Sequence, residues 1–185
     1  RILRSSSRSV STEVFGIPPK PSSLRSLSFA PREVVEVILT TLGSDGLLNA
    51  APMGVWVGQE WSLTLRPFRG TLTARNLAQI PEAVMNVTHD SSLFFRTAFK
   101  EEFATAAPLR FVRAKTVKAP RLHGMPAYIE VRVNPREVQH VAAEAKPDPD
   151  IMEFECFVRK IDVVRQPPAV YSRARCAAIE AVIHA

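Results

Sequence analysis

Two arginines and two threonines stand within eight positions of one another, in a segment whose residue types could bind an anion. Arg66, Arg69, Gly70, Thr71 and Thr73 offer guanidinium groups, a backbone amide and two hydroxyl groups. Hydrogen bonds from arginine to phosphate are about twice as strong as neutral ones, and free N–H groups at a helix start also favour an anion. The segment predicts a phosphate-binding loop led by Arg69 and Thr71. The alternative is that the arginines are solvated and the threonines only cap the helix.

Other motifs that carry chemistry are missing from the sequence. His89, His123, His140 and His184 are scattered, and none has the spacing to cysteine or acidic residues that a metal site needs. No GxSxG elbow, Walker loop or GxGxxG is present, which argues against hydrolase, nucleoside-triphosphatase and Rossmann functions. We therefore predict no metal, and the catalytic residues stay unknown.

Strands and short helices are predicted to position this loop. Residues 34–42 and 47–57 are apolar and flank a Gly-Ser-Asp-Gly turn, the pattern of a β-hairpin. Residues 61–65 alternate as in a half-buried strand, and the proline and glycine in residues 66–70 end the ladder. A short helix over residues 71–80 follows, capped by Thr71 or Thr73.

The second half of the chain continues the β pattern. One or two short strands or a helix are expected in residues 101–126, where the pattern is weak. A change of apolar phase predicts a β-bulge near Lys160. Further strands are predicted over residues 83–88, 128–133 and 153–164, and helices over residues 91–100 and 172–184. Together these elements predict a mainly β fold, a barrel with short helices and a C-terminal helix.

The net charge of +6 is concentrated near the start of the sequence. Residues 1–32 hold six basic residues against Glu13, a balance of +5, and the rest hold 18 basic against 17 acidic residues. A nearly neutral body argues against nucleic-acid binding by the folded part, although the basic segment could contact a polyanion. Residues 1–28, rich in Ser, Arg and Pro, are predicted to be a flexible tail, and residues 29–185 one folded domain.

Membrane insertion and disulfide formation are not expected. No run of about 18 uncharged apolar residues occurs, so we predict no membrane span. Cys156 and Cys176 fall in separate predicted elements, a strand and a helix, and we interpret them as reduced thiols. This pattern predicts a cytoplasmic protein.

Four sequence motifs carry a resemblance to a known family: VILTTLGSDGLLNAAPMGV, LRPFRGTLTARNL, VMNVTHDSSLF and SRARCAAIEAVIHA. Over roughly residues 33–185 the chain resembles an uncharacterised archaeal and bacterial family of FMN-binding, flavin reductase-like split-barrel proteins. The resemblance implies a Greek-key split barrel, a homodimer, and FMN held near the subunit interface. It implies no known substrate.

The residues that could contact the flavin ring follow from its chemistry. A flavin needs a flat apolar slot with polar groups at its edge. The candidates are small or strand-interrupting residues, alternating polar residues of a later strand, and one helix residue that could equally cross-link the helix: Asn49, Ala51, Pro52, Met53, Gly54, Asn86, Thr88 and Asn76. An irregular strand, or backbone partners for Asn86 and Thr88, would explain the same residues.

Three functions remain open. The first is a flavin-dependent oxidoreductase of unknown substrate, which would meet a nicotinamide or another small molecule as a transient partner. The second is a non-catalytic flavin carrier, sensor or pathway subunit, since no acid or base is apparent. The third is a flavin-free barrel that binds a polyanion through its basic tail.

Overall fold

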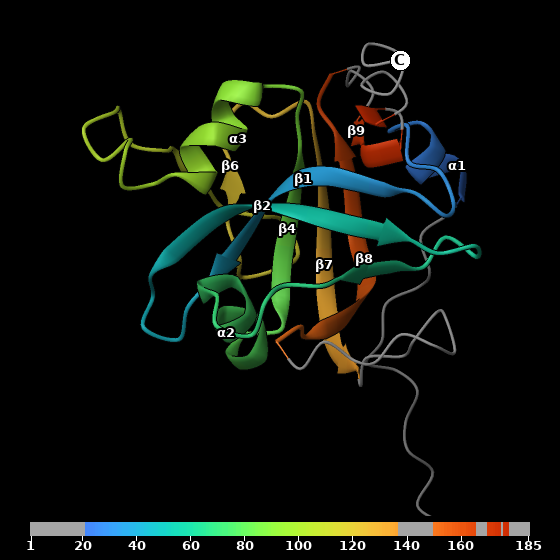
Figure 1. Ribbon diagram of the computed structural model, residues 1–185, viewed down its shortest axis with the longest axis horizontal. Helices are drawn as coiled ribbons and strands as arrows, with labels where there is room; N and C mark the ends of the chain where they lie inside the picture. Colours follow the sequence, from blue (N-terminus) through green and yellow to red (C-terminus); the bar gives the residue numbers. More distant parts are fainter. Residues whose placement is uncertain (1–20, 137–149, 166–169, 175, 178–185) are drawn as a thin grey trace, which may run out of the picture.

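The computed structural model describes residues 21–136, 150–165, 170–174 and 176–177. Six antiparallel strands close into a barrel in the order β1, β2, β3, β8, β7, β4 and back to β1 (Figure 1). A seventh strand, β9 (Tyr171–Ser172), pairs with Val35 and Glu36 of β1, on the side away from β2. The barrel strands are β1 (Val34–Leu42), β2 (Leu48–Val57), β3 (Leu63–Leu65), β4 (Glu82–Val87), β7 (Ala127–Arg136) and β8 (Glu153–Val163). The prediction of a mainly β barrel is confirmed.

Alternating side chains of these strands fill the barrel. Val35, Val37 and Leu39 of β1 point inward and are fully buried, and Met85 of β4 and Ile129 of β7 join them in one apolar cluster. Burying each such side chain contributes about 1.5–3 kcal/mol. The period-2 pattern that predicted these strands therefore reports the inner face of the barrel.

Two helices take the positions that matter for the site. α2 (Leu72–Gln79) places Leu77 in the barrel core. α3 (Ser91–Ala98) lies outside the barrel, where Leu93 packs on Ile38 and Ala50. Asp90 caps α3 by accepting hydrogen bonds from the amides of Ser92 and Leu93. Residues 101–126 contain one short hairpin, β5 (Phe111–Val112) with β6 (Arg121–Leu122).

The structure shifts the predicted start of one strand and confirms the predicted bulge in another. β3 starts at Leu63 rather than Trp61, because Trp61 has a φ of 64° and belongs to a turn closed by its N–H bond to Gly58. The bulge is confirmed: Glu130 pairs with Lys160 while Val131 pairs with Val158, so Arg159 is the extra residue of β8.

The start of the folded part lies earlier than predicted. Residues 21–28 were expected in a flexible tail, but α1 (Pro21–Arg25) forms there and Leu24 and Leu27 are fully buried with Phe29 in the core. A few apolar side chains at close spacing are enough to bring this serine-rich segment onto the barrel. Residues 1–20 lie outside the described residues.

The predicted C-terminal helix over residues 172–184 is only partly described. Ser172 belongs to β9 rather than to the helix, whereas Arg173, Ala174, Cys176 and Ala177 are helical. The other residues of that helix lie outside the described part of the chain. Cys156 and Cys176 are both free thiols, and burial raises the pKa of the Cys156 thiol far above its usual range.

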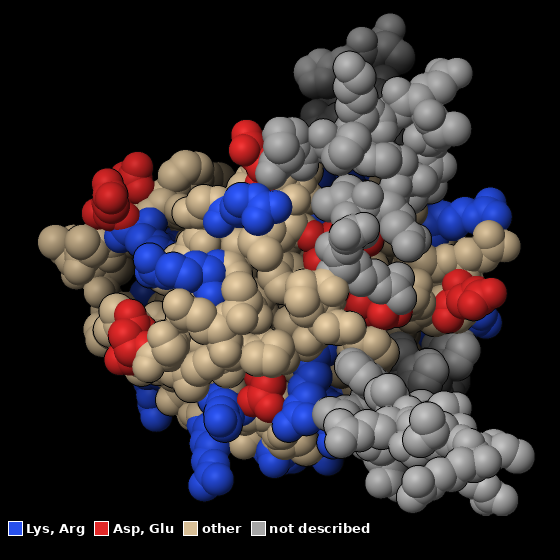
Figure 2. Space-filling model, turned by 90° about the horizontal axis from the view of Figure 1, so that it is seen from below, with Lys and Arg blue, Asp and Glu red and all other residues tan. Residues whose placement is uncertain are grey.

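Charged side chains of both signs share the surface. Figure 2 shows basic and acidic side chains on one face, separated by uncharged residues. No helix among the described residues is long and apolar enough to cross a membrane.

A buried ion pair fastens the segment before β6 to the outer face of β7. The Glu130 carboxylate is fully buried and accepts hydrogen bonds from the amides of Lys115 (2.7 Å) and Thr116 (2.6 Å) and from Arg121 Nε (2.8 Å). Burial alone would raise the pKa of Glu130, but the hydrogen bonds from Thr116, Lys115 and Arg121 outweigh it and hold the pKa below its ordinary value of 4.5.

Replacing Glu130 by Gln should therefore destabilise the protein at neutral pH by about 3 kcal/mol, because Arg121 loses a buried partner. Since the folded-state pKa is lowered, the stability that Glu130 contributes is complete above its ordinary pKa and is lost as the pH falls through the folded value. Urea unfolding of the wild type and Glu130→Gln at pH 7 and pH 4 measures both effects. The exposed Glu60→Gln is the matched control, and an equal loss in the two variants would contradict the account.

Candidate functional site

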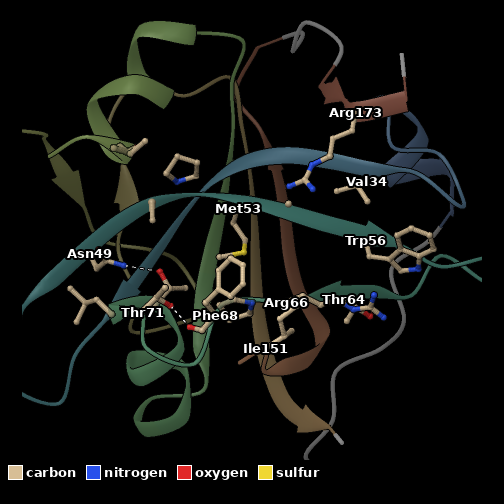
Figure 3. A pocket seen from close by; sticks show the side chains of 18 of the residues that line it. Val34, Asn49, Met53, Trp56, Thr64, Arg66, Phe68, Thr71, Ile151 and Arg173 are labelled. Carbon is tan, nitrogen blue, oxygen red and sulfur yellow. Dashed lines mark hydrogen bonds between the residues drawn. The ribbon is translucent and has the colours of Figure 1, made fainter. Parts of the chain in front are cut away.

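A pocket of about 690 Å³ lies between β2 and the loop that leads from β3 to α2 (Figure 3). Asn49 and residues 51–54 of β2 form one rim, and residues 66–68 and 71–73 form the other. The end of α3 lines the pocket near Asn49, whereas Val34, Trp56 and Arg173 lie toward its opposite end (Figure 3). The volume falls within the range of about 300–1,000 Å³ that is usual for small-molecule sites.

The rim formed by β2 is an unpaired strand edge. β3 pairs with β2 only from Val55 to Val57, so the preceding part of β2 has β1 on one side and the pocket on the other. The bonds Gly43 N–H to Leu47 O and Val57 N–H to Glu33 O fix the alternation of the β1–β2 ladder. By that alternation, the backbone polar groups of Ala50, Pro52 and Gly54 point away from β1.

Pro52 fits this position because its missing N–H would face the pocket and not β1. The ladder therefore loses no hydrogen bond, which agrees with the prediction that Pro52 stands at an edge or a bulge. The Gly54 amide and the carbonyls of Pro52 and Gly54 remain along this edge to bind the polar edge of a ligand.

The rim formed by the β3–α2 loop contains the N-terminus of α2. Thr71 caps the helix: its Oγ1 accepts a hydrogen bond from the Ala74 amide (3.2 Å) and donates one to the Phe68 carbonyl (2.7 Å). The amides of Leu72 and Thr73 lie in the first turn, where a helix provides no carbonyl partner. This end of the pocket therefore presents N–H groups and the positive end of the helix dipole.

Three cationic side chains reach the pocket. Arg66 Nε forms an ion pair with Glu153 (2.8 Å), and its guanidinium lies 6.0 Å from the centre of the Trp56 ring. Arg173 Nε pairs with Glu36. Lys100 Nζ donates to Asn49 Oδ1 at 2.6 Å.

Gly54 permits the close approach of Arg173. A Cβ atom at this position would lie 2.6 Å from Arg173 Nη2 and 3.0 Å from Val34 Cγ1. The lack of a side chain at Gly54 thus leaves space for an arginine from the end of the chain to lie over the edge of β2 (Figure 3).

The structure brings many of the predicted site residues together and leaves others outside the pocket. Those that line it are Asn49, Ala51, Pro52, Met53, Gly54, Arg66, Thr71 and Thr73. Arg69 and Gly70 belong to the same loop but do not line the pocket, and the Arg69 amide donates to the Asp150 carbonyl.

Asn76, Asn86 and Thr88 are buried among protein partners instead. Asn76 Nδ2 donates to Thr41 Oγ1, and Thr88 Oγ1 accepts from the Asp90 amide. Asn86 Nδ2 donates to the Ile38 carbonyl (2.9 Å), while its Oδ1 accepts from the Leu122 amide (2.8 Å). For these residues, backbone and side-chain partners explain the buried polar atoms.

Sequence reasoning did not identify several pocket residues. Phe68 is 60% exposed and its ring lies in the middle of the pocket, below Met53 (Figure 3). Lys100 is the last residue of the helix predicted over residues 91–100, which is an ordinary position for helix-dipole compensation. Arg173 comes from the far end of the chain, so no local signal could have connected it with the hairpin.

The described side chains that line the pocket can bind a ligand but offer no evident acid, base or metal ligand. Among the described residues, the pocket lining includes no carboxyl, imidazole or thiol group, and no group of three His, Cys, Asp or Glu could hold a metal ion. The arrangement can position a ligand with an anionic end, an apolar body and a polar edge.

The barrel and the position of its pocket define a split-barrel protein of the flavin reductase-like fold. Residues 35–165 match the model of a family described as the N-terminal domain of a protein of unknown function, DUF447. The match covers more than half of the chain, and the chain belongs to this family. A search of the curated proteins found no match.

Solved structures share the fold at low sequence identity. An FMN-bound protein of the DUF447 family from Methanosarcina mazei is 22% identical, with a TM-score of 0.58 over 87% of this chain and 78% of that one. A flavin reductase solved with NADP⁺ is 16% identical, with a TM-score of 0.57 over 84% and 99%. The flavin reductase of styrene monooxygenase from Pseudomonas putida is 14% identical, with a TM-score of 0.55 over 79% and 87%.

Replacing Thr71 by Ala should lower the free energy of unfolding by about 1 kcal/mol, because α2 loses its N-cap. Thr71→Ser keeps the hydroxyl and should stay close to the wild type. Urea unfolding of the three proteins measures the difference. Equal stability of the Ala and Ser variants would show that the cap seen in the structure contributes nothing.

Proposed function

We propose that the pocket binds FMN and that the protein is a flavin-dependent oxidoreductase. The observation that carries the proposal is the opposition, across a cavity of about 690 Å³, of an unpaired strand edge and a helix N-terminus. The FMN-bound Methanosarcina mazei protein, which has the same fold and family, supports it.

The strand edge suits the flavin ring. The Gly54 amide and the carbonyls of Pro52 and Gly54 would bind the polar edge of the ring, and Met53 and Phe68 would pack on its apolar faces. An exposed phenylalanine in the middle of a cavity is unusual without a ligand, because its burial is worth about 1.5–3 kcal/mol.

The helix end suits the phosphate. A phosphate monoester carries up to about two negative charges, and the amides of Leu72 and Thr73 would donate to it together with the Thr73 hydroxyl. Arg66 lies on the same rim, although its ion pair with Glu153 already offsets its charge.

Bound FMN would supply hydride or electron transfer, which is chemistry that the protein side chains lack. The chain would bind the cofactor, orient it along the edge of β2 and exclude water from the apolar part of the pocket. A nicotinamide or another small molecule is the proposed transient partner, and the resemblance to a flavin reductase solved with NADP⁺ supports this choice. The homodimer implied by the family resemblance stays a prediction.

One observation also favours a flavin carrier or sensor as a second candidate. The described pocket lining contains no carboxyl, imidazole or thiol that could act as a general acid or base near neutral pH. Direct hydride transfer between two cofactors does not need such a group, so the oxidoreductase stays the first candidate and the carrier or sensor the second.

Purified protein titrated with FMN should acquire flavin absorption bands near about 370 and 450 nm and bind with a micromolar or lower Kd, which is about −8 kcal/mol or better. Phe68→Ala should weaken FMN binding about tenfold, because the ring loses an aromatic contact worth about 1–1.5 kcal/mol. Phe95, with a similar exposure of 59% against 60% but outside the pocket, provides the matched control Phe95→Ala.

Wild-type protein that binds no FMN would contradict the proposal. Equal weakening by the two phenylalanine variants would place the flavin elsewhere on the molecule. Circular dichroism and thermal unfolding check that each variant is folded.

The FMN-loaded protein should lose its absorbance at 450 nm when NADH or NADPH is added without oxygen, since an oxidoreductase of this class needs a hydride donor. Stopped-flow absorbance measures the rate, and free FMN with the same nicotinamide gives the background. Tight FMN binding with reduction no faster than this background would favour the carrier or sensor.

A further inference from the structure

The three cations of the pocket differ in how their charges are compensated. Arg66 and Arg173 each form an ion pair with a carboxylate, Glu153 and Glu36 respectively. Lys100 has no carboxylate partner among the described residues, and its hydrogen bond goes to the neutral amide of Asn49. Lys100 therefore carries the uncompensated positive charge of the pocket.

The position of Lys100 is fixed by the packing of α3. Leu93 anchors the helix against Ile38 and Ala50, and the helix ends at Ala98 with Phe99 as its C-cap. Lys100 then returns toward β2, where its Nζ lies 2.6 Å from Asn49 Oδ1.

The Asn49 side chain holds the lysine in place. Its Nδ2 donates to Thr73 Oγ1 (3.1 Å) and to Thr41 Oγ1 (3.3 Å), and the residue is almost fully buried. An ammonium group can only donate, so the amide oxygen must face Lys100. Thr73 and Lys100 thus bind the same asparagine, and both line the pocket.

The cost of this arrangement points to an anion. Lys100 is an exposed residue, but contact with Asn49 at the pocket partly desolvates its ammonium group and lowers its pKa, because desolvation disfavours the charged form and no carboxylate among the described residues opposes the effect. An anion in the pocket would stabilise the charged ammonium group and so offset its lost hydration. The nearby Thr73 hydroxyl and the first-turn amides of α2 are donors for the same group.

We propose that Lys100 binds the phosphate group of the pocket's ligand and thereby selects FMN over riboflavin. This inference rests on the proposed function, and it adds a residue and a specificity to it. Lys100 would supply the positive charge, Asn49 would hold the ammonium group in position, and the start of α2 would supply neutral hydrogen-bond donors.

A purely structural role for Lys100 makes a different prediction. If the lysine only fixes Asn49, its loss would change the shape of the pocket and weaken FMN and riboflavin equally. If it binds phosphate, its loss would weaken FMN alone. Comparison of the two flavins separates these roles, because they share the ring and ribityl chain and differ in the phosphate.

The experiment is a fluorescence titration of the full chain with FMN, with riboflavin and with FMN in the presence of inorganic phosphate. Lys100→Met should weaken FMN binding about ten- to hundredfold, as expected for loss of a charged hydrogen bond, and leave riboflavin binding within about twofold. Lys100→Arg should retain most of the preference for FMN. Lys118→Met removes an exposed lysine outside this pocket and should change neither.

Asn49→Asp provides a second variant that keeps Lys100. The new carboxylate would lie against the ammonium group and compensate its charge, so FMN should bind more weakly while riboflavin binding changes little. Millimolar inorganic phosphate should compete with FMN in the wild type and less in Lys100→Met.

The outcomes separate this inference from the proposed function. A wild type that binds neither flavin would refute the proposed function itself. A wild type that binds both flavins equally, or a Lys100→Met variant that loses both to the same extent, would refute the role of Lys100 and leave the flavin site standing.

Discussion

Nine residue pairs join β2 to β1, whereas three join it to β3. This unequal pairing leaves the part of β2 before Val55 with a row of backbone groups that no neighbouring strand satisfies. A barrel normally removes such edges, so an edge kept open inside the barrel wall has to be occupied by something else. The pocket, its volume and the proposed flavin ring all depend on this break in the ladder.

The opposite rim is held by contacts with residues 150–152, which are distant in the sequence but precede β8, the strand that pairs with β3. In the loop before α2, Phe68 forms a bridge with Ile151, the Arg69 amide donates to the Asp150 carbonyl, and the Met152 amide donates to the Pro67 carbonyl. Residues 150–152 lead directly into β8, so the loop is fixed relative to the barrel. The N-terminus of α2 therefore faces the β2 edge as a consequence of barrel closure, and not of its local sequence alone.

Local patterns in the sequence were sufficient for the scaffold and for part of the site. The Gly-Ser-Asp-Gly turn and its flanking apolar runs predicted the hairpin of β1 and β2, and the change of apolar phase predicted a bulge near Lys160, which the structure has at Arg159. Thr71 or Thr73 was predicted to cap α2, because a threonine at a helix start can accept a hydrogen bond from a free amide, and the structure shows that Thr71 is the cap. Turn residues, the alternation of apolar side chains and helix capping determine these features, and all three depend on neighbouring residues in the sequence.

The remaining features depend on contacts that no local pattern contains. Lys100 enters the pocket because α3 packs beside β2, and Arg173 enters it because the preceding strand β9 pairs with β1. Asn86 shows the opposite case: alternation correctly indicated a buried polar residue, but its amide binds the backbone of Ile38 and Leu122. A sequence shows that a buried polar group needs a partner, whereas the fold decides which partner it receives.

The central claim is that a flavin occupies the open edge of β2, and amide chemical-shift mapping tests it most directly. In a ¹⁵N-labelled sample titrated with FMN, the account predicts the largest shifts at amides of the two pocket rims, those of Gly54 on β2 and of Leu72 and Thr73 on α2. Amides that face β1 across the same strand, such as those of Ala51 and Met53, should shift less. Shifts confined to the hollow between Arg113 and Lys118, or the absence of any shift at saturating FMN, would contradict the claim.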